Sequence, residues 1–177
     1  MDAYPHNRKT TKESLLQNLK YEKKHHLTLL QWKRFVAGED DLDPSVIGPE
    51  LQQAWRRCRE LGVDPHAKPV HEIATGERLA QLFKDNQTLI DVSNPFLERL
   101  YGFLKASKFT VALFDRQGYV LHVLQDRQHE KINVRFNWFP GSRWTQRTAG
   151  NTTVCETIFH KKPIELFGTQ HYKKRFH

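Results

Sequence analysis

The sequence predicts an α+β protein with a mostly antiparallel sheet and helices packed against it. Apolar residues recur at helical spacing through most of the first hundred residues, and β-branched and aromatic residues replace that pattern after Ser107. Of the 177 residues, 38% are hydrophobic and 11% are aromatic. The chain can therefore bury the core of one ordinary domain, with some length left for an appended segment.

A long helix is predicted over residues 12–36, where apolar residues recur without an interrupting Gly or Pro. Its apolar stripe, which includes Leu15, Leu19, Leu27 and Phe35, is narrow. A narrow stripe suits packing against a partner helix, including the same helix of a second copy. We therefore expect a homodimer through this helix.

Further helices are expected before the sheet begins. ProGlu at 49–50 opens a second helix, and Gly62 ends it. Cys58 lies on the apolar face of that helix, which favours a packed thiol over a nucleophile. Helical periodicity resumes from Thr75, and Pro95 is predicted to stand near the start of another helix.

The sheet is predicted to begin with a hairpin. KFTVALFD at 108–115 and YVLHVLQ at 119–125 read as two strands, joined by the turn sequence DRQG. Apolar and polar residues alternate over 131–139, which predicts a third strand. A helix over 148–160 and a fourth strand over 161–167 complete the predicted fold.

Charge and composition exclude several classes of function. The net charge of +8 comes largely from lysines and arginines near the two ends, without a motif typical of nucleic-acid recognition. We therefore expect solvated basic surfaces and no direct nucleic-acid binding. No apolar run approaches the roughly 18 residues of a membrane span, and the first residues contain no signal-peptide pattern. A cytoplasmic protein with reduced thiols is expected, with no membrane association.

Three ordered stretches carry a resemblance to a known family: AWRRCRELGVDP at 54–65, KFTVALFDRQGYVLHVL at 108–124, and the run from PGSRW to the last residue at 140–177. The chain resembles, over about residues 50–177, the N-terminal GAF sensor domain of sigma-54-dependent transcriptional activators of the acetoin-catabolism and dihydroxyacetone-kinase regulator type. The resemblance implies a GAF-like antiparallel sheet with flanking helices.

The resemblance also implies a domain organisation. Residues 1–70 would form an N-terminal helical segment that could dimerise, and residues 71–177 a GAF-like sensor domain. The family's GAF fold continues with further strands, so we expect this domain to be incomplete at its C-terminus, and the chain to be either a fragment of a larger regulator or a truncated relative. Relatives carry an AAA+ ATPase and a helix-turn-helix domain downstream. The chain itself contains no Gly-x-x-x-x-Gly-Lys-Ser/Thr phosphate loop, so ATP hydrolysis is not expected of it.

The sequence departs from the family pattern at positions that bear on a ligand. Gln146 and Gln170 stand where relatives have Glu. In the family's central motif Gly150 is kept, but relatives have Thr, Asn, Ala and Gly at the positions of Asn151, Thr152, Thr153 and Cys155. An amide replaces a carboxylate at both Gln positions, which adds hydrogen-bond donors and removes charge. The ligand of a relative therefore does not transfer directly to this chain.

In a GAF domain the effector pocket lies between the sheet and the helix or loop that covers it. The resemblance, together with aromatic and polar residue types, predicts that a small effector binds in the segment 136–156. The predicted ligand-binding residues are Phe136, Trp138, Trp144, Asn151, Thr152, Thr153, Cys155 and Glu156.

The predicted function is that of a signal-sensing regulatory domain, in which a small effector controls the downstream ATPase of a bacterial activator. One alternative is a protein-interaction or dimerisation domain whose aromatic residues fill a core and leave no pocket. A GAF enzyme, such as a methionine sulfoxide reductase, is a further alternative; it would depend on Cys155, whose thiolate a helix N-terminus would favour. That region offers no second thiol, so we expect no enzyme and no cofactor. His25 and His26 are adjacent on a helix and point apart, and His171 and His177 lie among lysines that repel a cation, so we expect no metal site.

Overall fold

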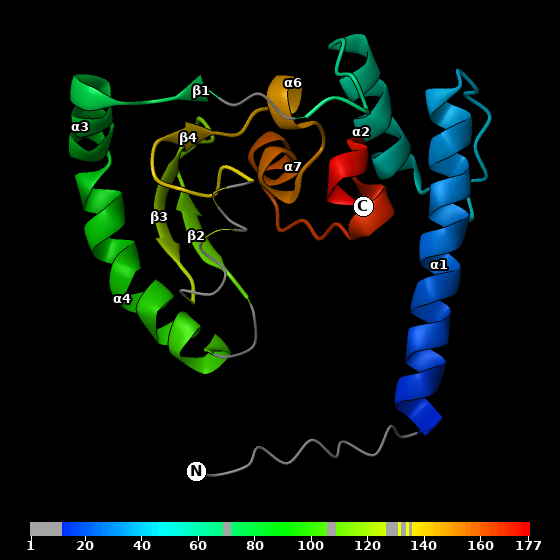
Figure 1. Ribbon diagram of the computed structural model, residues 1–177, viewed down its shortest axis with the longest axis horizontal. Helices are drawn as coiled ribbons and strands as arrows, with labels where there is room; N and C mark the ends of the chain where they lie inside the picture. The colour runs from blue at the N-terminus through cyan, green and yellow to red at the C-terminus, as the bar shows by residue number, and fades with distance from the viewer. Residues whose placement is uncertain (1–11, 69–71, 106–108, 127–130, 132–133, 135) are drawn as a thin grey trace.

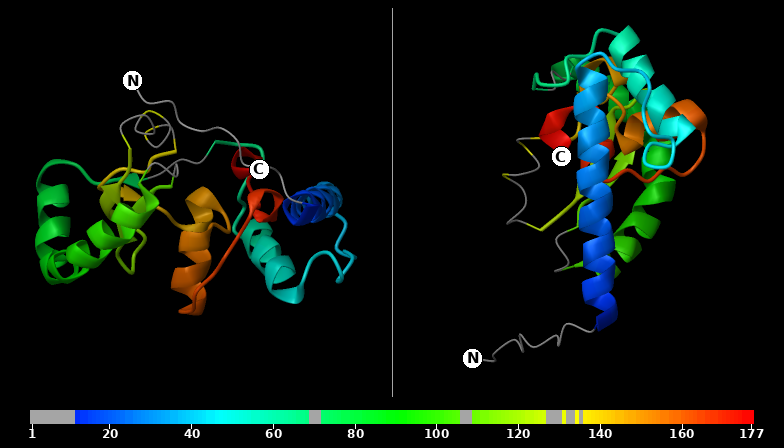
Figure 2. Two further views of the ribbon diagram at one scale, coloured as in Figure 1. Left: turned by 90° about the horizontal axis from the view of Figure 1, so that it is seen from below. Right: turned by 90° about the vertical axis from the view of Figure 1, so that its right-hand side faces the viewer.

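The computed structural model describes residues 12–68, 72–105, 109–126, 131, 134 and 136–177. Two long helices, α1 and α4, lie on opposite sides of the molecule, and the short strands and α7 lie between them (Figure 1). Seen from below and from the side, the same arrangement holds, with the C-terminal residues placed between α7 and α1 (Figure 2). The α+β class predicted from the sequence is confirmed.

The first two helices agree with the sequence prediction. Helix α1 spans Lys12–Val36 and α2 spans Pro49–Glu60. Among the side chains of α1 that the structure describes, those that join the core lie in its C-terminal half, where Trp32 and Phe35 are buried. Its N-terminal half extends away from the other elements in Figure 1, and there Leu19 is 61% exposed.

Helix α3 spans Gly76–Asp85, and α4 spans Gln87–Leu104. The prediction that a helix starts near Pro95 is wrong, because Pro95 lies inside α4 and the break falls at Asn86. The Asn86 side chain and backbone N–H both donate to the carbonyl of Leu82, which ends α3. The Asn86 carbonyl then accepts from the N–H of Ile90 and starts α4.

The predicted hairpin is confirmed. Strands β2 (Val111–Phe114) and β3 (Val120–Leu124) pair antiparallel, and Asp115 accepts two backbone N–H bonds in the turn between them. Strand β1 (Glu72–Ile73) pairs antiparallel with β4 (Ser142–Arg143) in a second short sheet. Sequence periodicity missed this second pair because two-residue strands carry no readable alternation.

Two further predicted strands are wrong for the residues that the structure describes. Within 131–139, Lys131 and Val134 are helical and Phe136 and Asn137 form a turn, in which Asn137 adopts a φ of +56°. Residues 132, 133 and 135 lie outside the described part of the chain. Residues 163–167 are irregular. Ile164 and Leu166 are half-buried and line a cavity, which gives the sequence the same alternation as a strand with one buried face.

The predicted helix over 148–160 is divided in two. Helix α6 spans Gln146–Ala149 and α7 spans Thr153–His160. Gly150 separates them with a φ of +75°, a backbone conformation that favours glycine. Thr152 then caps α7 by accepting the N–H of Cys155.

The last residues of the chain contact both α1 and α2. We call residues 168–177 the C-terminal segment; it contains the 3₁₀ turns η1 (Gly168–Gln170) and η2 (Lys174–Phe176). The indole of Trp55 donates to the carbonyl of Gln170, and the indole of Trp32 donates to that of Tyr172, each over 2.8 Å. Helices α1 and α2 and the C-terminal segment therefore share one hydrophobic core, in which Tyr172 packs with Trp32, Phe35 and Trp55.

Candidate functional site

The predicted effector region contains a cavity of about 330 Å³ beside the N-terminus of α7. We call it the aromatic cavity. It is lined by Phe136, Trp138, Trp144, Thr152, Thr153, Val154, His171, Arg175, Phe176 and His177. Its volume lies near the lower end of the range of about 300–1,000 Å³ that is usual for small-molecule sites.

Aromatic rings form the inner wall of this cavity. Trp138 and Trp144 meet edge to face with their ring centres 5.2 Å apart, and Phe176 lies 6.0 Å from Trp144 and 6.1 Å from Phe136. Trp144 is only 2% exposed, and its indole donates to the carbonyl of Asn137. These contacts hold the rings in place before any ligand binds.

The hairpin turn fixes the backbone of Trp144. The N–H of Trp144 donates to the carbonyl of Gly118 over 2.8 Å. A Cβ at Gly118 would overlap the carbonyl oxygen of Trp144, so this close approach requires glycine. The sheet and the cavity wall are therefore built as one unit.

The remaining wall comes from the C-terminal segment. The guanidinium of Arg175 lies 4.9 Å from the ring centre of Phe136, at cation–π distance. Nδ1 of His171 donates to the carbonyl of Gly168, and Nε2 of His177 donates to the carbonyl of His171. Burial lowers the pKa of both histidines, which favours their neutral forms near pH 7.

Among the residues predicted to bind a ligand, Phe136, Trp138, Trp144, Thr152 and Thr153 come together in the aromatic cavity, and three others do not line it. Asn151 is fully buried; its amide donates to the carbonyl of Gln170 and accepts the N–H of Tyr172. Cys155 accepts a hydrogen bond from the hydroxyl of Thr152. Glu156 pairs with Arg57 over 2.6 Å.

The structure explains why position 146 is a glutamine where relatives have a glutamate. Nε2 of Gln146 donates to Oε1 of the buried Glu156 over 2.8 Å, while Arg57 pairs with the other oxygen. A glutamate at position 146 would place a second carboxylate against Glu156, and this repulsion would be costly in a buried site. Gln170 has a different role, since its side chain accepts the N–H of Phe167 within a turn.

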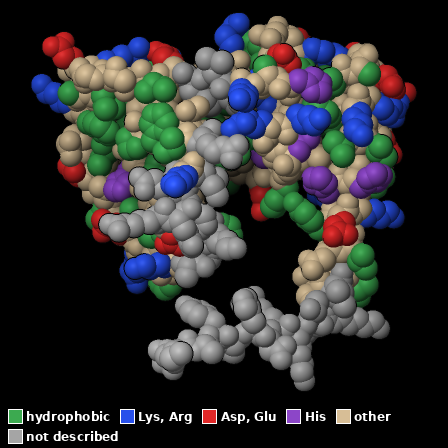
Figure 3. All heavy atoms as spheres, viewed as in Figure 1, with side chains coloured by type: hydrophobic (Ala, Val, Ile, Leu, Met, Phe, Trp, Pro, Cys, Tyr) green, Lys and Arg blue, Asp and Glu red, His purple; other side chains and the backbone are tan. Residues whose placement is uncertain are grey.

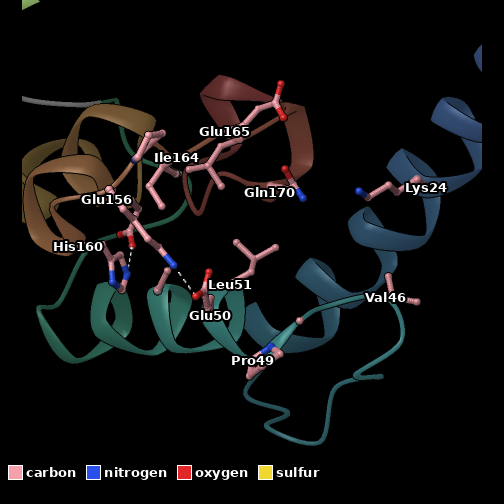
Figure 4. Close-up of a pocket in the computed structure, with 15 residues that line it drawn as sticks. Lys24, Val46, Pro49, Glu50, Leu51, Glu156, His160, Ile164, Glu165 and Gln170 are labelled. Carbon is pink, nitrogen blue, oxygen red and sulfur yellow. Dashed lines mark hydrogen bonds and ion pairs between the residues drawn. The ribbon is translucent and has the colours of Figure 1, made fainter.

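A second, larger cavity of about 680 Å³ lies between α1, α2, α7 and residues 163–166. In Figure 4, Lys24 points from α1 toward Gln170, and His160 and Glu156 lie on the opposite side. Lys162 pairs with Glu50 over 2.6 Å, which lowers the pKa of that carboxyl. Sequence reasoning missed this cavity, because its walls come from segments far apart in the chain.

Both cysteines are buried and free. The sequence-based expectation that the helix N-terminus favours a Cys155 thiolate is not met, because burial raises the pKa of that thiol to about 11. Burial, with the charge of Glu156, raises the pKa of Cys58 to about 12. The thiols of the folded protein are therefore protonated at neutral pH.

The chain is similar in sequence to known transcriptional regulators, although no family model matches it. It is 25% identical over 149 residues to the acetoin dehydrogenase operon transcriptional activator AcoR of Bacillus subtilis (strain 168), covering 84% of this chain and 24% of AcoR. It is 22% identical over 162 residues to the acetoin catabolism regulatory protein of Cupriavidus necator, covering 85% of this chain and 23% of the relative. The chain thus spans about a quarter of the length of these relatives.

A solved structure shares the fold. The chain superposes with a TM-score of 0.69 and 16% identity on a chain of the crystal structure of the E. coli DhaR(N)–DhaL complex, covering 73% of this chain and 44% of that one. The resemblance to the sensor region of acetoin-type transcriptional activators is confirmed, and the relatives named here are transcriptional regulators. No helix in the described part of the chain is long and apolar enough to cross a membrane.

The state of the thiols can be tested directly. Near neutral pH, neither Cys58 nor Cys155 should react with Ellman's reagent in the folded protein, and both should react at once in denaturant. The rate for the folded protein should rise as the pH approaches about 11, the raised pKa of Cys155. Rapid reaction of a Cys58→Ser variant at neutral pH, with its circular dichroism unchanged, would contradict the burial of Cys155.

Proposed function

We propose that this chain is the signal-sensing region of a bacterial sigma-54-dependent transcriptional activator. A small effector binds in the aromatic cavity and thereby controls a downstream AAA+ ATPase that also carries the DNA-binding domain. The observation that carries this proposal is the cavity itself, which brings together Phe136, Trp138 and Trp144 with Thr152 and Thr153 in a chain whose relatives regulate transcription. The site of action is the cytoplasm, and this segment binds neither membrane nor nucleic acid directly.

The C-terminal segment supplies a route by which an effector changes the rest of the molecule. Arg175 and Phe176 contribute to the cavity wall, and a few residues earlier Gln170 and Tyr172 accept hydrogen bonds from Trp55 and Trp32. A ligand that prefers one position of this segment also shifts α1 and α2, to the extent of its differential affinity.

A homodimer through α1 is the second part of the proposal. The N-terminal half of α1 exposes apolar side chains, among them Leu16 and Leu19, beyond the body of the molecule. A second copy of the same helix would cover them. Since the C-terminal half of α1 packs in the shared core, a shift there can change how the two copies meet.

A second candidate, a protein-interaction domain, is favoured by the exposed face of α4. Val92, Phe96 and Phe103 are 63%, 72% and 80% exposed, and they lie at helical spacing on one face. Figure 3 shows exposed hydrophobic side chains on the side of the molecule that carries α3 and α4, while Lys, Arg and His gather on the opposite side. Exposed apolar patches of this kind commonly mark protein contacts. The related fold occurs in a complex of DhaR(N) with DhaL.

Filling the aromatic cavity should abolish effector binding. A Thr153→Trp variant places an indole at the cavity wall, so a compound from a metabolite panel that raises the Tm of the wild type should no longer do so. Thr157→Trp is the matched control, since Thr157 lies on the same helix and does not line the cavity. Equal Tm shifts in the wild type and in the folded Thr153→Trp variant would contradict binding at this cavity.

One pair of variants can distinguish whether two copies meet through α1 or through the exposed face of α4. Leu19→Asp should reduce the mass measured by light scattering to that of a monomer, because a charge enters the α1 contact. Phe96→Asp introduces the same charge on α4 and should leave the dimer mass unchanged. The reverse result would move the contact between copies to α4, and an unchanged mass in both variants would exclude both surfaces.

A further inference from the structure

We propose that the larger cavity between α1, α2 and α7 is a second ligand site, which binds a small aliphatic carboxylic acid in its anionic form. The carboxylate lies between Lys24 and Gln170, and the aliphatic chain lies against the apolar side chains of the cavity wall. No described residue lines both this cavity and the aromatic cavity. The inference is therefore independent of the effector proposed for the aromatic cavity.

The walls of the larger cavity suit an aliphatic chain. Its volume of about 680 Å³ accommodates a molecule of several carbons, and none of its described lining residues carries a phenyl, phenol or indole ring. In Figure 4, Leu51 lies between Lys24 on one side and His160 on the other. Burial of ligand methylene groups against such a wall is favourable. The apolar lining side chains are those of Val46, Leu51, Ala54, Pro163, Ile164 and Leu166.

Two of the carboxylates in the lining are already neutralised. Glu50 pairs with Lys162 over 2.6 Å, and Glu156 pairs with Arg57 at the same distance. A cationic ligand placed beside either carboxylate would also meet the positive side chain that holds it. These two pairs therefore do not make the cavity a site for a cation.

Two other charged side chains of the lining, Lys24 and Glu165, have no ion-pair partner among the described residues. In Figure 4 the carboxylate of Glu165 points away from Leu51, whereas Lys24 extends from α1 toward Gln170. The charge that is directed into the cavity without a partner is thus the ammonium of Lys24. It is an exposed group, so a small anion can reach it from solvent.

Gln170 supplies a second donor next to this ammonium. Its Oε1 accepts the backbone N–H of Phe167 over 2.8 Å, which fixes the amide with its NH₂ group on the other side. Within the described part of the chain, neither this NH₂ group nor the ammonium of Lys24 has an acceptor. Thr169 donates to the carbonyl of His25 over 3.1 Å, which holds the neighbours Gln170 and Lys24 side by side. Two adjacent donors, one of them charged, select an anion.

The identity of residue 170 supports the same assignment. Gln170 stands where relatives have Glu, and a glutamate there would pair with Lys24 and repel a carboxylate ligand. The amide removes that charge and leaves the ammonium for a ligand. An acid held by both residues also connects α1 to the C-terminal segment.

The test uses three six-carbon probes that share an unbranched chain and differ in charge: hexanoate, hexan-1-ol and hexylammonium. Isothermal titration of the full chain at low ionic strength should show hexanoate binding about tenfold more tightly than hexan-1-ol, as expected for one charge-assisted contact. Hexylammonium should bind most weakly. Lys24→Gln should reduce hexanoate to the affinity of hexan-1-ol. Gln170→Glu should also remove the preference for hexanoate, because it places a carboxylate beside Lys24.

Lys23→Gln is the matched control, because Lys23 is the exposed neighbour of Lys24 on α1 and does not line the cavity. It should leave all three affinities unchanged. Ile164→Trp fills the cavity from its apolar side, so in the variant shown to be folded by circular dichroism both hexanoate and hexan-1-ol should bind more weakly.

Three results would overturn the inference: hexan-1-ol binding as tightly as hexanoate, hexylammonium binding best, or no binding of any probe. An equal loss of hexanoate affinity in Lys23→Gln and Lys24→Gln would overturn it as well, because it would indicate general attraction to the basic surface of α1. None of these results bears on effector binding in the aromatic cavity, which the Thr153→Trp variant tests separately.

Discussion

Two backbone carbonyls, those of Gln170 and Tyr172, determine how the parts of this molecule are joined. They accept hydrogen bonds from the indoles of Trp55 and Trp32 and from the amide of Asn151. Asn151 and the indole of Trp32 are buried, and a buried donor without a partner costs about 1–3 kcal/mol. The C-terminal segment can therefore occupy its place only if α1, α2 and the break between α6 and α7 all keep theirs. The shared core around Tyr172 and the outer wall of the aromatic cavity both depend on this arrangement.

The same constraint gives the proposed sensor its physical basis. A ligand in the aromatic cavity touches a segment that is bound on its other side to the helices, and packed side chains have few alternative arrangements. In the proposed mechanism, a change at Arg175 or Phe176 would be passed to Gln170 and Tyr172 over a short length of chain. Because α1 extends beyond the body of the molecule, a small rotation at its buried end becomes a larger displacement at its exposed end (Figure 1).

Much of the fold could be predicted from the sequence, and the exceptions have identifiable causes. Helices α1 and α2 and the β2–β3 hairpin follow from periodicity and turn residues that act locally. The strand predicted over 161–167 is wrong. Ile164 and Leu166 alternate with polar residues because both line the larger cavity, whose other walls include α1 and α2. The resemblance to sensor domains, with the residue types, pointed to five residues that line the aromatic cavity: Phe136, Trp138, Trp144, Thr152 and Thr153. His171 and Arg175 could not be foreseen, because an irregular segment places them and its path depends on distant donors such as Trp32 and Trp55.

The central claim is that the C-terminal segment couples the cavity to α1, and hydrogen–deuterium exchange of an Asn151 variant tests it most directly. Asn151 lies near the cavity and touches the segment, while α1 is bound to the segment's other side. In Asn151→Ala, which removes both hydrogen bonds of this amide, the account predicts faster exchange in the C-terminal half of α1 together with residues 168–177. Unchanged exchange in α1, with faster exchange confined to the residues around position 151, would contradict it.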